Sequence, residues 1–192
     1  AYAQLVLTDP ASIDAVKAHF DVLDVLINNA GANFPGGLDE SAPDGFDASV
    51  ALNLNGTYRL TVALRRALKA STAPGGAAVV NLSSMSALRA VTMVPGYSAA
   101  KAGIIALTRT LAVKWARDGI RVNAVAPGTI DTPMTAPMQG IPALIDSEVA
   151  HIPLGRFGRV EELAPTIAFL CTENSSYTSG ALFVVDGASD CF

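Results

Sequence analysis

Residues 77–84, Ala-Ala-Val-Val-Asn-Leu-Ser-Ser, form an apolar run that ends in two serines, and this run decides the fold. An apolar run of this length between turn signals predicts a strand that is buried on both faces. The glycines of Pro74-Gly75-Gly76 precede the run and close a helical pattern over residues 43–70. A second helical pattern follows over residues 97–117. A buried strand between two helices predicts a parallel sheet covered by helices.

The same alternation extends over the rest of the chain. It predicts strands over residues 4–7, 22–27, 77–82, 120–126 and 181–185, and helices over residues 11–20, 43–70, 97–117, 143–150 and 160–171. Residues 133–159 are punctuated by proline and glycine and are expected to form a loop around the short helix. We therefore expect one α/β domain over residues 1–192, built on a doubly wound parallel sheet.

The composition excludes several classes of function. Hydrophobic residues make up 51% of the chain, charged residues 16%, and the net charge is −4, which does not favour nucleic acid or an anionic membrane. No apolar run is long enough to span a membrane and the first residues lack a secretion signal, so we expect a cytoplasmic protein. Two cysteines do not predict a disulfide scaffold, and the two isolated histidines predict no metal site.

Polar residues and glycines gather where three predicted strands end. They lie at residues 28–31, 83–84 and 127–132. The carboxyl ends of parallel strands meet at one edge of the sheet, where ligands of such folds bind. A packed core does not need polar residues there, so this edge is expected to be a functional site.

Tyr97 and Lys101 are four residues apart in a predicted helix, so their side chains share one face. A neighbouring ammonium favours the phenolate form of a tyrosine, so the pair could act as a general acid/base. Ser84, just past a strand, could hydrogen-bond a substrate oxygen or could simply cap a turn. Asn53 lies inside a long helix, where it is either tolerated or marks a local kink around a bound water.

Five blocks, in order and with their spacing, make the sequence resemble the short-chain dehydrogenase/reductase family. The blocks are Asn28-Asn29-Ala30-Gly31, Leu52-Asn53-Leu54-Asn55-Gly56, Asn81-Leu82-Ser83-Ser84, Tyr97-Ser98-Ala99-Ala100-Lys101 and Pro127-Gly128-Thr129-Ile130-Asp131-Thr132. The resemblance implies a Rossmann-type fold and an NAD- or NADP-dependent oxidoreductase that interconverts a secondary alcohol and a ketone. Reduction of a 3-oxoacyl thioester is a further possibility that the sequence leaves open.

The resemblance also implies roles for individual residues. Tyr97 would exchange the proton with the substrate oxygen, and Ser84 would orient and polarise that oxygen. Lys101 would bind the nicotinamide ribose and lower the pKa of Tyr97, and Asn53 would hold a water that links Lys101 to solvent. The expected cofactor contacts are Leu7 (through its backbone), Asn29, Ala30, Gly31, Tyr97, Lys101, Pro127, Gly128, Ile130 and Thr132.

The family's glycine-rich phosphate-binding turn is not among these residues, because residues 4–7 correspond to its third strand. We expect roughly 50 further residues to precede this point in the family pattern. Without them, the alternative is an inactive subunit with a structural role. The long apolar helices, together with the pairing of such helices in similar family members, predict a homotetramer or, as the alternative, a dimer. Residues 133–159 are expected to cover a small alcohol or ketone substrate.

Overall fold

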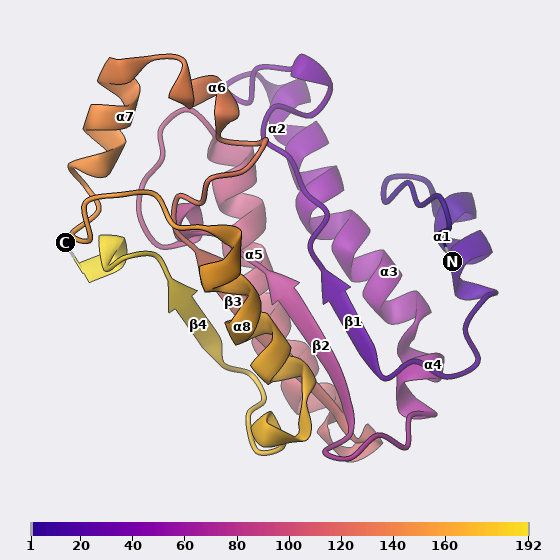
Figure 1. The fold of residues 1–192 in the computed structure, drawn as a ribbon. Coiled ribbons are helices and arrows are strands. Elements are labelled where there is room, and N and C mark those ends of the chain that lie inside the picture. The colour runs from indigo at the N-terminus through magenta and orange to yellow at the C-terminus, as the bar shows by residue number, and fades with distance from the viewer. Residues whose placement is uncertain (1, 192) are drawn as a thin grey trace.

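The computed structural model describes residues 2–191, apart from the side chain of Gln139, and these residues form one parallel sheet. Its strands are β1 (Val25–Asn28), β2 (Ala77–Leu82), β3 (Ile120–Pro127) and β4 (Leu182–Val185), and they lie side by side in chain order (Figure 1). Parallel neighbours need a crossover between them, and the crossovers place helices on the faces of the sheet. The predicted α/β fold is confirmed.

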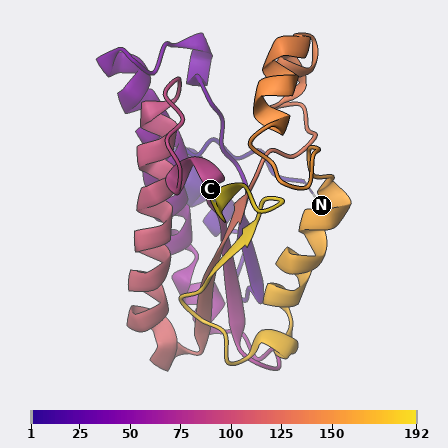
Figure 2. The same ribbon diagram turned by 90° about the vertical axis from the view of Figure 1, so that its left-hand side faces the viewer.

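Helices cover both faces of this sheet. The helix α5 (Pro95–Trp115) lies on one face and α8 (Val160–Cys171) on the other (Figure 2). In β2, Val79 packs in a cluster with residues of α5, whereas the next residue, Val80, packs in a cluster with residues of α8. The strand is therefore buried on both faces, as its apolar run predicted.

Shorter elements surround this core. The helix α1 (Pro10–Lys17) packs against α3 (Thr57–Ala63), and α6 (Ala136–Gln139) and α7 (Pro142–Val149) stand beyond the carboxyl ends of the strands (Figure 1). Short 3₁₀ turns lie at Pro35–Gly37, Met85–Ala87, Ala116–Asp118, Glu173–Ser175 and Ser189–Cys191. Across residues 2–191, none of the helices has the length and apolar character that a membrane crossing requires.

The helix predicted over residues 43–70 is divided. It consists of α2 (Pro43–Val50), a π-helical turn (Ala51–Gly56), α3, and α4 (Arg65–Lys69). Asn53 lies within the π-helical turn, so the local irregularity that this mid-helix asparagine suggested is present. Such turns often occur at functional sites, because they reorient side chains without ending the helix.

The strand predicted over residues 4–7 is wrong. Residues 2–6 have no regular structure, and Leu7 lies in a turn, buried against Ile13, Leu60 and Leu64. A strand needs a neighbour with which to exchange backbone hydrogen bonds, and within the described residues β1 pairs only with β2. Leu7 and, in part, Leu5 pack against helices instead, whereas Val6 is exposed.

Gly45, in the first turn of α2, allows the chain before this helix to fold tightly onto it. A Cβ atom at this position would overlap the carbonyl oxygen of Asp39 and would lie 3.0 Å from the backbone nitrogen of Glu40. The backbone at residues 39–40 is therefore fixed against α2 by the absence of a side chain at Gly45.

We expect Gly45→Ala to lower the free energy of unfolding by about 2–4 kcal/mol, because the added methyl must displace backbone atoms. Gly140→Ala is the matched control, since a Cβ there would have its nearest neighbour 3.9 Å away, at the Pro137 carbonyl oxygen. The control should change stability by less than about 1 kcal/mol. Urea unfolding of both variants measures the difference, and equal losses would contradict the close contact at Gly45.

Candidate active site

The first turns of α5 bring Tyr97 and Lys101 together, as their spacing predicted. The Lys101 Nζ atom lies 5.3 Å from the centre of the Tyr97 ring. It also donates a hydrogen bond of 2.8 Å to the carbonyl oxygen of Leu82, the last residue of β2. Only 9% of Tyr97 and 4% of Lys101 is exposed. The ammonium is thus held between a phenol ring and the end of a strand.

Ser84, two residues after the end of β2, lies beside the Tyr97 phenol. Its hydroxyl oxygen accepts a hydrogen bond of 3.2 Å from the backbone N–H of Ser86 and so caps the turn at Met85–Ala87. A hydrogen bond between Ser84 and the Tyr97 phenol lowers the pKa of Tyr97. Ser84 therefore caps a turn, as the sequence allowed, and it also neighbours the phenol, whereas its hydrogen bond to a substrate oxygen stays a prediction.

Burial dominates the ionisation of the Tyr97–Lys101 pair. It raises the pKa of Tyr97, Ser84 partly offsets this effect, and the negative charge of Glu40 raises the pKa further. Burial also lowers the pKa of Lys101 to about 8. The expected lowering of the Tyr97 pKa by Lys101 is not seen, because Lys101 is not among the groups that shift this pKa and desolvation is the largest cause.

Asn53 fastens the loop after β1 to the helical layer. Its side-chain nitrogen donates to the Ala32 carbonyl oxygen (2.9 Å) and to the Ser49 carbonyl oxygen (3.0 Å), and its side-chain oxygen accepts from the Ala32 N–H (3.0 Å). A Cβ on Gly31 would lie 2.6 Å from the Asn53 oxygen and 3.3 Å from the Lys101 nitrogen. The glycine therefore lets this loop pass beside the ammonium. The water-holding role of Asn53 stays a prediction.

The remaining residues expected at the cofactor divide into two groups. Asn29, Ala30 and Gly31 follow β1, and Pro127, Gly128, Ile130 and Thr132 occupy or follow the end of β3, so all seven lie along the carboxyl edge of the sheet. The Leu7 side chain is buried among helix side chains, and the expected contact of its backbone with the cofactor stays a prediction.

Asn28 begins the same motif but points into the core. Its side-chain nitrogen donates to Thr61 (2.8 Å) and to the side-chain oxygen of Asn81 (2.7 Å), and Asn81 in turn donates to Thr108 (2.9 Å). These buried hydrogen bonds connect β1, β2 and the helices on one face, so Asn28 supports the site from beneath.

Two features of the site were missed by sequence reasoning. One is Glu40, which is almost fully buried although it stands in a polar loop. The other joins α7 to the sheet edge: Glu148 accepts a hydrogen bond of 2.6 Å from Thr129 and forms an ion pair of 2.7 Å with Arg89. No local pattern signals either feature, because each depends on residues that are distant in the chain.

The arrangement fits the nicotinamide riboside half of a dinucleotide. Gly31 leaves the loop after β1 without a side chain beside the Lys101 ammonium. Within the described residues, the ammonium donates one hydrogen bond, to the Leu82 carbonyl oxygen. Because an ammonium carries three donors, two remain for the hydroxyls of a ribose. The residues at the ends of β1 and β3 would flank such a group.

Comparison with known proteins supports this interpretation. The family model described as enoyl-(acyl carrier protein) reductase matches residues 10–188. An uncharacterised short-chain type dehydrogenase/reductase of Sinorhizobium fredii is 37% identical over 174 residues, which are 90% of this chain and 31% of the relative. The cis-4-hydroxycyclohexanecarboxylate dehydrogenase of Sinomonas cyclohexanicum is 41% identical over 179 residues, covering 92% of this chain and 70% of that enzyme.

Solved structures agree with the sequence comparison. The structure of a 2-deoxy-D-gluconate 3-dehydrogenase assigned in Agrobacterium tumefaciens, with bound NADP, superimposes with a TM-score of 0.85 at 32% identity, over 98% of this chain and 75% of that one. The chain thus spans less than a third of one curated relative and about three quarters of this solved neighbour. The sequence match, the parallel sheet and the Tyr97–Lys101 pair lead to one conclusion: the chain belongs to the short-chain dehydrogenase/reductase family.

Proposed function

We propose that the protein interconverts a secondary alcohol and a ketone, with NAD or NADP as the hydride carrier. The observation that carries this proposal is the meeting of the Ser84 hydroxyl, the Tyr97 phenol and the Lys101 ammonium at the carboxyl edge of the sheet. Ligands of open α/β sheets bind at this edge. The family membership of the chain supports the same chemistry.

In this mechanism the chain supplies the proton path and the orientation of the substrate. In the direction of reduction, the Tyr97 O–H gives its proton to the carbonyl oxygen, while the Ser84 hydroxyl donates a hydrogen bond to that oxygen and stabilises its developing negative charge. In the direction of oxidation, the phenolate takes the proton back from the alcohol. The nicotinamide, when bound, supplies or accepts the hydride.

The raised pKa of Tyr97 has a consequence for these two directions. At neutral pH the phenol keeps its proton, which is the form that ketone reduction requires. Lys101, with a pKa of about 8, is mostly an ammonium at neutral pH and is able to donate to the ribose hydroxyls. Of the other residues proposed at the cofactor, Asn29, Ala30, Gly31, Pro127, Gly128, Ile130 and Thr132 lie at the same edge.

The substrate is proposed to be a small molecule covered by α6, α7 and the segments around them. Apolar side chains are exposed in this region at Met134, Ile141 and Leu144. The hydroxycyclohexane compound in the name of one relative supports a secondary alcohol on a modestly apolar frame. A panel of alcohols, ketones and 3-oxoacyl thioesters, assayed in the whole protein with NAD(H) and NADP(H), tests the substrate class. A cytoplasmic location remains a prediction.

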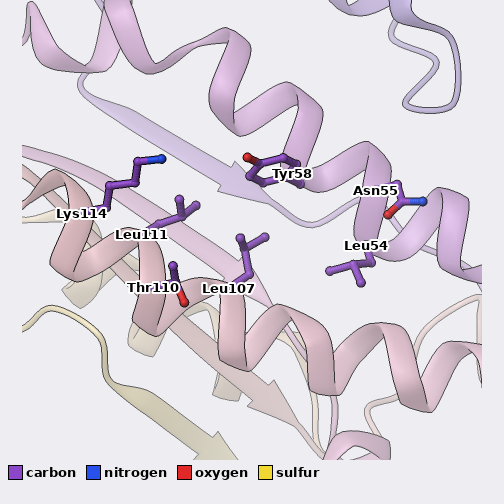
Figure 3. A pocket seen from close by; sticks show the side chains of 7 residues that line it. All are labelled: Leu54, Asn55, Tyr58, Leu107, Thr110, Leu111 and Lys114. Carbon is purple, nitrogen blue, oxygen red and sulfur yellow. The ribbon is translucent and has the colours of Figure 1, made fainter.

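We also propose that the protein assembles into a homotetramer through α5 and the helical run before it. A groove between these elements is lined by Leu54, Asn55, Tyr58, Leu107, Thr110, Leu111 and Lys114 (Figure 3). Val113, in the last turns of α5, is 83% exposed. Exposed apolar side chains around a groove are typical of interfaces between subunits.

Tyr97→Phe should lower turnover by about 10²–10⁴-fold, because it removes the proton donor and leaves the packing of the ring nearly unchanged. Cofactor affinity should change little, since the phenol acts on the substrate. Steady-state kinetics and a cofactor titration of the same preparation measure the two effects. A variant that keeps more than about a tenth of the wild-type turnover would contradict the proposed role.

Lys101→Ala should lower cofactor affinity and turnover together, because it removes both the ribose donor and the cation beside the phenol. The contrast with Tyr97→Phe separates the two roles in one assay. Unchanged cofactor affinity in Lys101→Ala would show that the ammonium does not hold the ribose. Failure of the wild-type protein to turn over any substrate of the panel would favour the alternative of an inactive structural subunit.

For the assembly, light scattering at micromolar concentration should give a mass of four subunits. Val113→Arg should lower that mass, because a buried interface does not accommodate an unpaired guanidinium. Val22→Arg is the matched control, since Val22 is also exposed but precedes β1. A monomeric wild type, or an equal effect of the two variants, would contradict this interface.

A further inference from the structure

Glu40 is a buried carboxylate whose two oxygens are occupied by backbone groups of two separate segments. One oxygen accepts a hydrogen bond of 3.0 Å from the N–H of Phe34, and the other accepts one of 2.7 Å from the N–H of Tyr97. The residue is 1% exposed, and across residues 2–191 no ion pair joins it to a lysine or arginine. A carboxylate is costly to bury in this way, since only hydrogen bonds compensate its desolvation.

The hydrogen bond to Tyr97 caps the helix that carries the reactive phenol. The α5 helix begins after Val94, whose side chain has no polar atom to cap it, so Tyr97 occupies the third helical position. An N-cap side chain normally accepts a hydrogen bond from the N–H at the second or third position. Glu40 takes over this function from 57 residues away in the chain, and its negative charge also suits the positive end of the helix dipole.

The surrounding backbone leaves this cap little freedom. The loop that carries Glu40 is pressed onto α2 at Gly45, as described above. A Cβ on Gly96 would lie 3.0 Å from both the Cα and the carbonyl oxygen of Phe46, so α5 also passes very close to α2. The carboxylate thus joins two closely packed elements at the residue that bears the phenol.

We propose that Glu40 is a positioning residue for Tyr97, because its carboxylate fixes the first turn of α5, the turn that carries the reactive phenol. Its effect on the phenol is electrostatic, because a buried negative charge disfavours a second one nearby. The groups that act on the phenol are the Ser84 hydroxyl, from the loop after β2, and the Glu40 charge, from the loop before α2, while the Lys101 ammonium of α5 lies against the ring. Of these, Ser84 lowers the pKa of Tyr97 and Glu40 raises it.

This inference rests on the proposed function of Tyr97 only in the experiments that measure turnover. The NMR titration does not depend on it. The ionisation of the phenol can be followed directly, by carbon NMR of ring-labelled tyrosine, with Tyr97→Phe used to assign the signal. In the wild-type protein, Tyr97 should titrate at higher pH than the ordinary tyrosine value of about 10. A Tyr97 midpoint at or below that ordinary value would overturn the proposal, even if no variant of Glu40 can be prepared.

Glu40→Gln removes the charge and nearly keeps the shape of the side chain, although its amide can accept only one of the two backbone hydrogen bonds. The Tyr97 midpoint should fall to lower pH, because the negative charge that raises the pKa of Tyr97 is gone. In the whole enzyme, the pH at which alcohol oxidation gains activity should fall by a similar amount, because the phenolate then forms at lower pH. Glu40→Asp keeps the charge but shortens the side chain, so the Tyr97 midpoint should stay near that of wild type while hydrogen exchange of the Tyr97 amide becomes faster.

Glu161→Gln is the matched control, since it removes an equal charge from an exposed residue of α8, on the other face of the sheet. It should leave the Tyr97 midpoint unchanged. A Glu40→Gln protein that loses stability while its Tyr97 midpoint stays at the wild-type value would show that Glu40 is only a structural cap. A shifted NMR midpoint without any turnover would support the inference and count against the proposed function.

Discussion

The hydrogen bonds between the Asn53 side chain and both backbone groups of Ala32 are the constraint on which the site depends. They hold the loop after β1 against the helical layer at the point where Gly31 passes the Lys101 ammonium. An asparagine can satisfy an N–H and a C=O at once, whereas an aspartate or a leucine cannot. These bonds therefore fix the loop after β1 beside the Lys101 ammonium of α5.

The π-helical turn at Ala51–Gly56 interrupts the regular helix at the point where Asn53 makes these hydrogen bonds. In a regular helix the side chain of residue 53 would project in a different direction, and the extra backbone residue of the π turn redirects it. The turn is stabilised by the contacts that Asn53 makes once it is buried. The π-helical turn and the conformation of the loop after β1 therefore depend on each other. Neither conformation is determined by the sequence of its own segment alone.

This mutual dependence explains which parts of the structure the sequence could predict. The strand at Ala77–Leu82 and the helix at Val160–Cys171 match their predictions to the residue. In each, the positions of the apolar residues reflect which residues of that element face the core. The segment over residues 4–7 is apolar enough for a strand, but its conformation depends on whether a neighbour is available for pairing. Local pattern carries no information about that neighbour.

The site divides in the same way. Tyr97 and Lys101 were predictable because their contact lies within one helix, at a spacing that the helix fixes. Glu40 and Glu148 were not predictable, because each carboxylate meets its partners only through the tertiary fold. The direction of the Tyr97 pKa shift could not be foreseen either, since it follows from the depth of burial rather than from the identity of the neighbours.

The separation between the chemical groups and the segment proposed to cover the substrate has a consequence for how such an enzyme can change. Tyr97, Lys101 and Ser84 stand on α5 and at the end of β2, whereas α6 and α7 belong to a later segment that joins the sheet edge through Glu148. Under the proposed function, substitutions in that segment would alter the shape offered to a substrate without moving the proton path. New specificities would then be accessible through mutations that leave the reaction itself intact.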